Sequence, residues 1–382
     1  MTTSLTRILL ATDGSEEAAL AGRAAADISN KTAAELHVVH VWTDVPPPAS
    51  PSPSLDNYSR LAKEEATRLL RREAWNARVA GSRMIREHLC EGRPAEEIIA
   101  LAEELDADLV VVGSRRAGRI KRLITGSVSE HVVHRASCPV LVICGGEGAW
   151  PAARVIVADD GSGPARKAGD LAAKIANLFG AEVVVVRAYE HPPEPVGGWS
   201  AQDRRELDEA LWRNRRDLKV RAEQLEEIAP CRPKTRLIKS KAAAAINLVA
   251  EEGEERQTLF AVGSRGLRAP ERALFGSVST AVLRAADGPV LIVPSETASA
   301  RRSRGTAREA NEPETRLPIG LQPESENRSE AKRVDRRHGG DTEPAGAGEA
   351  SRYGLVAGGK GRASSQGDAD RRLRRWASAA GL

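Results

Sequence analysis

The sequence contains an internal duplication, which limits the folds that this chain can adopt. Three short motifs of the first half recur 150 residues later: VGSR at 112 and 262, GSVS at 126 and 276, and PVL at 139 and 289. Nearer the start of each half the spacing is 147 residues, since the DGS motif at 13–15 recurs at 160–162. A period of this length indicates two similar domains, because solenoid repeats have periods of about 20–50 residues.

Each half alternates short apolar runs with amphipathic segments. The runs lie near 7–12, 36–41, 84–89, 109–113 and 139–143, and again near 154–158, 182–187, 235–239, 259–263 and 289–293. Near-continuous apolar strands that alternate with helices are typical of a parallel sheet covered on both faces. We therefore predict an α/β fold of two Rossmann-like, doubly wound parallel-sheet domains in tandem. Domain 1 spans 1–146, domain 2 spans 150–296, and a disordered charged tail occupies 297–382.

Charge separates the tail from the body. The tail carries 17 Lys and Arg against 12 Asp and Glu, a net of +5, which leaves 40 basic and 41 acidic residues for 1–296. The tail is also too poor in large apolar residues to offset the entropy of folding. A near-neutral body argues against a large nucleic-acid surface on the folded part. The basic run at 371–376 is the candidate contact for an acidic partner, and a purely solubilising tail is the alternative.

The sequence shows few signs of membrane insertion, secretion or disulfide bonding. No apolar stretch approaches the 18–20 residues that a membrane crossing needs, so we expect no transmembrane segment. The N-terminal residues lack a secretory signal pattern, and the four cysteines include no CxxC pair. These features predict a cytoplasmic protein without a disulfide scaffold.

Two features of each half point to a ligand site. Open α/β sheets bind ligands outside the carboxyl ends of their strands, which is where the DGS motif and the glycine-rich loop after the fourth strand are expected. That loop leads into a helix that begins with GSVS. A helix N-terminus offers unpaired N–H groups and partial positive charge, so its natural ligand is an anion, above all a phosphate.

The glycine-rich loops resemble the G-2x-G-9x-G-S/T nucleotide motif of universal stress proteins. The second half matches this motif in full at Gly263, Gly266, Gly276 and Ser277. The first half carries Gly113, Gly126 and Ser127, with Arg116 in place of the middle glycine. The resemblance covers about residues 5–295 and omits the tail.

The resemblance implies which residues hold the ligand. In the family, an aspartate after the first strand and a valine at the end of the second strand hold the adenosine part. These positions are Asp13 and Val41 in the first half, and Asp160 and Ala188 in the second. The triphosphate would lie on the motif glycines and on the first residues of the following helices, which also include Val128, Ser129, Val278 and Ser279. The implied cofactor is ATP, with or without Mg²⁺.

Arg116 makes the first site differ from the second. An arginine in a backbone conformation that needs glycine costs about 1–2 kcal/mol. Its guanidinium is also a good bidentate partner for a phosphate. We predict that Arg116 weakens the first site, and the alternative is that it binds phosphate itself.

Three classes of function are open. The leading interpretation is an ATP-binding tandem universal stress protein that acts as a nucleotide-dependent regulatory module. The second is a slow ATPase or phosphotransferase, against which the loops lack a Walker lysine. The third is a scaffold with empty sites. As in dimers of the family, the last strands, at 138–143 and 289–293, would pair edge to edge, either within one chain or in a homodimer.

The spacing of the histidines does not favour a metal or catalytic site. His131 and His134 have a spacing compatible with one metal, yet the second half has Ala281 and Arg284 there and no third ligand is evident. A solvated helix face is therefore favoured. His37 and His40 fall on opposite faces of one strand, so they cannot act together.

Overall fold

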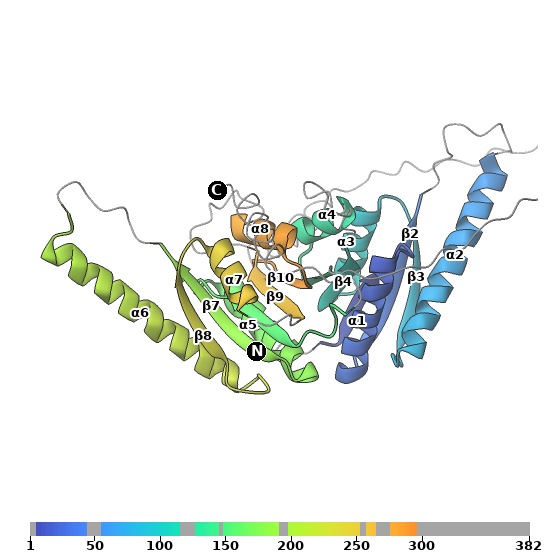
Figure 1. Cartoon of the computed structure of the whole chain (residues 1–382). Coiled ribbons are helices and arrows are strands. Elements are labelled where there is room, and N and C mark those ends of the chain that lie inside the picture. Colours follow the sequence, from blue (N-terminus) through green and yellow to red (C-terminus); the bar gives the residue numbers. More distant parts are fainter. Residues whose placement is uncertain are drawn as a thin grey trace, which may run out of the picture.

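The computed structural model describes residues 5–43, 55–114, 127–144, 148–190, 198–252, 257–264 and 276–295 (Figure 1). Two repeats of a mostly parallel α/β fold are present, as predicted. Both repeats contribute to a single sheet of ten strands in the order β3-β2-β1-β4-β5-β10-β9-β6-β7-β8. The tail beyond residue 295 lies outside the described residues.

The strands of each repeat run parallel to one another. The first repeat contributes β1 (Arg7–Ala11), β2 (Glu35–Trp42), β3 (Ile85–Glu91), β4 (Leu109–Gly113) and β5 (Val140–Ile143). The second contributes β6 (Arg154–Ala158), β7 (Glu182–Tyr189), β8 (Lys234–Lys239), β9 (Thr258–Gly263) and β10 (Val290–Val293). Except in the edge strands β3 and β8, most of their side chains are aliphatic and buried, on both faces of the sheet, which explains the uninterrupted apolar runs in the sequence.

The two repeats join through their last strands. β5 and β10 pair antiparallel, with Val140 opposite Ile292, Leu141 opposite Leu291 and Val142 opposite Val290. This is the intramolecular form of the edge-to-edge pairing that the sequence analysis anticipated. The pairing turns two five-stranded halves into one sheet with an approximate two-fold relation between them (Figure 1).

Helices cover both faces of the sheet (Figure 1). One hydrophobic core includes side chains of α1 (Glu16–Thr32), α2 (Leu55–Val79), α5 (Gly163–Phe179) and α6 (Ala201–Glu226). The core on the opposite face includes α3 (Pro94–Glu104), α4 (Ser127–Arg135), α7 (Ala242–Glu251) and α8 (Ser277–Ala285). Within the described part of the chain, no helix is long and apolar enough to cross a membrane.

Trp150, which lies between the two repeats in the sequence, contacts a helix of each repeat. The indole Nε1 of Trp150 donates a hydrogen bond to Asp27 Oδ2 of α1 at 3.0 Å. The same ring packs edge-on against Phe179 of α5, with 5.0 Å between ring centroids. Lys31 of α1 places its ammonium 5.1 Å from the centroid of that phenylalanine ring. These contacts tie α1 to α5 on the face opposite α4 and α8.

A histidine pair lies between β2 and β3. His37 Nδ1 and His88 Nε2 are 2.9 Å apart, and the two rings stack with centroids 5.1 Å apart. Burial lowers the pKa of both imidazoles below the ordinary value. The neighbouring carboxylate of Glu35 acts in the opposite direction on both rings. His40 instead contacts the backbone oxygen of Thr12, so the two histidines of β2 have separate partners, as their spacing predicts.

We expect this pair to make stability fall as pH drops below about 6.5, the ordinary histidine pKa. Because the folded-state pKa values are lowered, the unfolded chain binds more protons in this range, so stability rises with pH. Urea unfolding at pH 7.5 and pH 5 measures the difference. His37→Val, which installs the residue found at the equivalent position 184, should reduce the pH dependence. An unchanged dependence in this variant would assign the effect to other groups.

Candidate functional site

The DGS turns lie at the carboxyl ends of β1 and β6. Asp13 Oδ1 accepts hydrogen bonds from the backbone N of Ser15 at 3.0 Å and from its Oγ at 2.5 Å. Asp160 Oδ1 accepts from the backbone N of Ser162 at 2.9 Å. Each aspartate therefore shapes the turn that leads into a helix, and each remains exposed at the edge of the sheet.

Both turns also depend on glycine and serine. Gly14 and Gly161 adopt φ of +74° and +81°, a conformation in which an L side chain is strained. The following serine caps the next helix, because Ser15 Oγ accepts from the backbone N of Ala18 and Ser162 Oγ accepts from that of Ala165. In each turn the aspartate is therefore exposed to solvent, and the serine is the N-cap of the helix that follows.

Val41 and Ala188 lie at the same sheet edge as these aspartates, on the neighbouring strands β2 and β7. Ala11 of β1 pairs with Val39 of β2, so Asp13 and Val41 each stand two residues beyond a paired position. The pairing of Ala158 with Val186 places Asp160 and Ala188 in the same relation. The register therefore places the two residues expected to hold the adenosine part at the carboxyl ends of neighbouring strands in each repeat.

The strands that precede the glycine-rich loops, β4 and β9, lie next to β1 and β6 in the sheet. β1 lies between β2 and β4, and β6 lies between β7 and β9, so the strand order reverses at β1 and at β6. Ligands of open α/β sheets bind at such a switch point. The predicted site residues Arg116, Gly126 and Gly266 lie outside the described residues, as does the side chain of Ser127.

The first glycine of each motif allows a strand end to pack closely against a helix. A Cβ on Gly113 would lie 2.6 Å from the backbone carbonyl carbon and oxygen of Glu17 in α1. A Cβ on Gly263 would lie 2.7 Å from the backbone N of Ala165 in α5. These glycines let the ends of β4 and β9 touch the first turns of α1 and α5, which the sequence analysis had assigned to phosphate contact alone.

α8 begins at a glycine cap. Gly276 is its N-cap, with φ −80° and ψ 145°, and its N–H donates to Ser264 O at 2.6 Å. Ser279 is buried, and its hydroxyl donates back to Gly276 O at 3.0 Å. Ser277 is exposed and Val278 is half-buried. The first turn of α8 contains no acidic residue, so nothing in it opposes an anion.

The start of α4 differs in its charge. Glu130 lies in the first turn of this helix, where its carboxylate adds negative charge. Ser129 is buried and Val128 is half-buried, as at the equivalent positions of α8. His134 Nε2 lies 3.7 Å from Glu130 Oε1, and His131 is exposed. Among the described residues, no cluster of three or more His, Cys, Asp or Glu side chains is arranged to hold a metal ion.

A buried ion pair that the sequence analysis missed joins the residues that directly precede Asp160 and Ala188. Arg187 of β7 forms an ion pair with Asp159, whose side chain is 1% exposed. Its Nε also donates to the backbone oxygen of Asp159 at 3.3 Å. His40 makes the corresponding contact in the first repeat, 2.8 Å to Thr12 O. The 147-residue spacing that relates His40 to Arg187 was the available signal.

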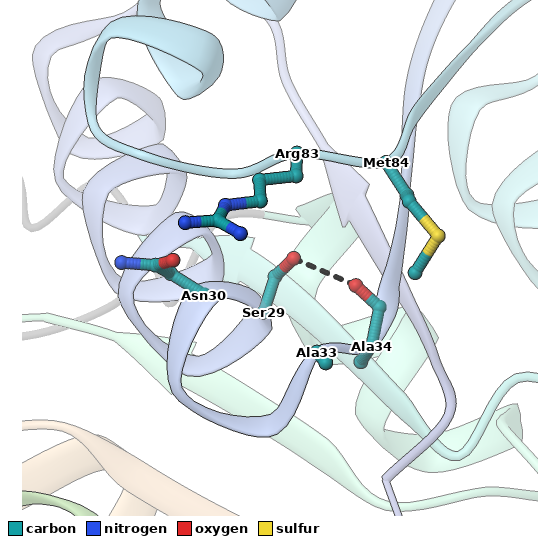
Figure 2. A pocket seen from close by; sticks show the side chains of 6 residues that line it. All are labelled: Ser29, Asn30, Ala33, Ala34, Arg83 and Met84. Atoms are coloured by element: carbon teal, nitrogen blue, oxygen red, sulfur yellow. Dashed lines mark hydrogen bonds between the residues drawn. The ribbon is translucent and has the colours of Figure 1, made fainter.

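The cavity in Figure 2 lies away from these turns. It has a volume of about 330 Å³ and lies where α1 ends and β2 and β3 begin. Ser29 Oγ donates to Ala34 O at 2.8 Å along its wall, and Arg83 and Met84 complete the opposite side (Figure 2). It belongs to the amino end of the strands, whereas the candidate site lies at their carboxyl end.

Comparisons with known proteins agree with this arrangement. The model of the universal stress protein family matches residues 4–143 and again 152–294. The chain therefore belongs to the universal stress protein family. A universal stress protein of Mycobacterium tuberculosis is 28% identical over 305 residues, which are 75% of this chain and 96% of that protein. One of Methanocaldococcus jannaschii is 38% identical over 141 residues, 36% of this chain and 81% of that protein.

Solved structures share the fold. A universal stress protein of Archaeoglobus fulgidus superposes with a TM-score of 0.56 at 23% identity, over 77% of this chain and 99% of that one. A universal stress protein in complex with cAMP is 27% identical, covers 37% of this chain and 97% of that one, and has a TM-score of 0.29. The first comparison supports a tandem arrangement that spans both repeats.

Proposed function

We propose that the chain is a nucleotide-dependent regulatory module that binds ATP, with or without Mg²⁺, in its second repeat. The observation that carries this proposal is the start of α8, where a glycine cap and an acid-free first turn stand at a switch point of the sheet. The phosphates would lie on this helix start and on Gly266, and the adenosine part would lie between Asp160 and Ala188. The other residues of the proposed site are Gly263, Ser277, Val278 and Ser279.

The first repeat would carry a weaker copy of this site. Its residues are Asp13, Val41, Gly113, Arg116, Gly126, Ser127, Val128 and Ser129. Two differences support a lower affinity: the middle glycine of the motif is Arg116, and the first turn of the helix contains Glu130. We propose that the repeats act as the two domains of the sequence analysis, 1–146 and 150–296, within one sheet.

The decisive experiment measures nucleotide carried by the pure protein. The full chain is purified without added nucleotide and denatured, and the released adenine nucleotide is quantified against chain concentration. We expect about one ATP per chain if only the tighter site retains its ligand. Added ATP should bind in calorimetry, and cAMP should bind less tightly because it presents a single phosphate to the helix start. A chain that carries no nucleotide and binds none on titration would contradict the proposal and favour a scaffold with empty sites.

A turnover assay separates the regulatory module from the enzyme. The bound ATP of a regulatory module should remain intact over many hours. Steady release of ADP and phosphate by the parent, lost together with binding in a site variant, would instead identify a slow ATPase.

Arg116→Gly should tighten the weaker site of the first repeat, so that the purified chain retains closer to two ATP molecules than one. Glycine restores the full motif spacing and removes the cost of a side chain in a glycine conformation. Isothermal calorimetry on the full chain measures both stoichiometry and affinity. Loss of binding at the first repeat (site one, with site two in the second repeat) would identify Arg116 as a phosphate ligand. An unchanged stoichiometry would mean that a residue other than Arg116 weakens site one.

A further inference from the structure

One ion pair joins α4 and α8 across the junction of the repeats. Arg284 Nη2 lies 3.2 Å from Glu130 Oε1, and the two residues are 154 positions apart in the sequence. Glu130 is in the first turn of α4, whereas Arg284 is in the last turn of α8. The antiparallel pairing of β5 with β10 brings these two helices side by side (Figure 1).

The pair has no symmetric counterpart. The residue 150 positions after Glu130 is Thr280, and the residue 150 positions before Arg284 is His134. Thr280 uses its hydroxyl within its own helix start, donating to Gly276 O at 3.0 Å. The first turn of α4 therefore carries a carboxylate, while the first turn of α8 does not.

A carboxylate in the first turn affects any phosphate bound there. Its charge interacts favourably with the positive end of the helix dipole, and it repels a phosphate placed at the same helix end. Arg284, 3.2 Å from this carboxylate, offsets that repulsion at any pH, whereas His134, 3.7 Å from the same oxygen, does so only when protonated. Because the side chains of Glu130 and Arg284 are 30% and 57% exposed, solvent and salt weaken this effect.

We propose that Arg284 of the second repeat sets the phosphate affinity of the nucleotide site in the first repeat by neutralising Glu130. This inference rests on the proposed nucleotide binding and adds a residue from the other repeat to site one. Arg284 acts through Glu130 and is therefore a positioning residue. By linkage, phosphate at site one should strengthen the ion pair between the repeats.

The test is a double-mutant cycle on the full chain. The background is Gly276→Val, which blocks site two so that ATP titrated in calorimetry at low salt reports site one. Arg284→Gln should lower the affinity about two- to fivefold, as expected for an exposed charge pair. Glu130→Thr, which installs the residue of the second repeat, should raise the affinity. In the Glu130→Thr background, Arg284→Gln should have little further effect.

Two controls make the result specific. Arg135→Gln removes the same charge from the last turn of α4 and should change the affinity less than Arg284→Gln. In 0.5 M salt, the effect of Arg284→Gln should shrink, because the Debye length falls to about 4 Å. Melting temperatures of all variants show whether the fold is kept.

The outcomes separate this inference from the proposed function. An equal effect of Arg284→Gln with and without Glu130, or no effect, would overturn the inference. If the parent binds ATP and the Gly276→Val background binds none, site one has no affinity to set and the inference fails while the proposed function stands. If the parent itself binds no ATP, the proposed function fails first.

Discussion

Replacing Gly276 by valine should abolish ATP binding in the second repeat. The side chain would occupy the space next to the first N–H groups of α8, where the phosphates are proposed to lie. The backbone of Gly276 has φ −80° and ψ 145°, which valine adopts without strain, so the fold should be kept. Calorimetry with ATP should show the tighter site lost, and an unchanged melting temperature should show an intact fold.

The matched control is Gly126→Val at the equivalent position of the first repeat. It should leave the tighter site intact and affect only the weaker one. If Gly276→Val bound ATP as tightly as the parent, the second-repeat assignment would be wrong. If Gly126→Val removed the tighter site instead, the roles of the two repeats would be reversed.

Gly113→Ala should destabilise the protein by about 1–3 kcal/mol, the usual cost of overpacking. The added methyl would lie 2.6 Å from the carbonyl carbon and oxygen of Glu17 and 2.7 Å from the backbone N of Ala18. These are backbone atoms of the first turn of α1, so the helix and the end of β4 would have to separate. Urea unfolding measures the loss in free energy of unfolding.

Gly22→Ala provides the matched control in the same repeat. A Cβ at this position would lie 3.7 Å from Leu10 Cδ2, an ordinary contact, within α1. Alanine in a helix interior is favoured over glycine by about 0.5–1 kcal/mol, so this variant should gain stability. Equal effects of the two substitutions would refute the packing role that we assign to Gly113.

The glycines of the nucleotide motif have two different roles. Gly113 and Gly263 are required where a strand end touches a helix start, which concerns the fold of this chain. Gly276, in contrast, caps the helix that is proposed to hold the phosphates. The spacing of the motif therefore combines a packing requirement with a ligand requirement, and the two can be separated by measuring stability and affinity for each variant.

Much of the fold was predictable from local patterns. Short runs such as Leu109–Gly113 and Val290–Val293 are almost wholly buried, and their length and uninterrupted aliphatic, β-branched composition predict this without a structure. Ser15 with Glu16 and Glu17 after it is a recognisable helix start, and α1 begins there. The duplication identified both DGS turns, because equivalent residues recur at a constant spacing.

The two repeats and the order of their elements could be predicted from the sequence alone, as could the sheet edge proposed for a ligand, because these depend on neighbouring residues and on spacing. Which distant side chains meet became evident in the folded structure. The pairing of β5 with β10 creates one sheet and brings Glu130 to Arg284. Strand register sets His37 against His88 and Arg187 against Asp159. Such contacts depend on the register and relative orientation of whole elements, which short sequence patterns do not encode.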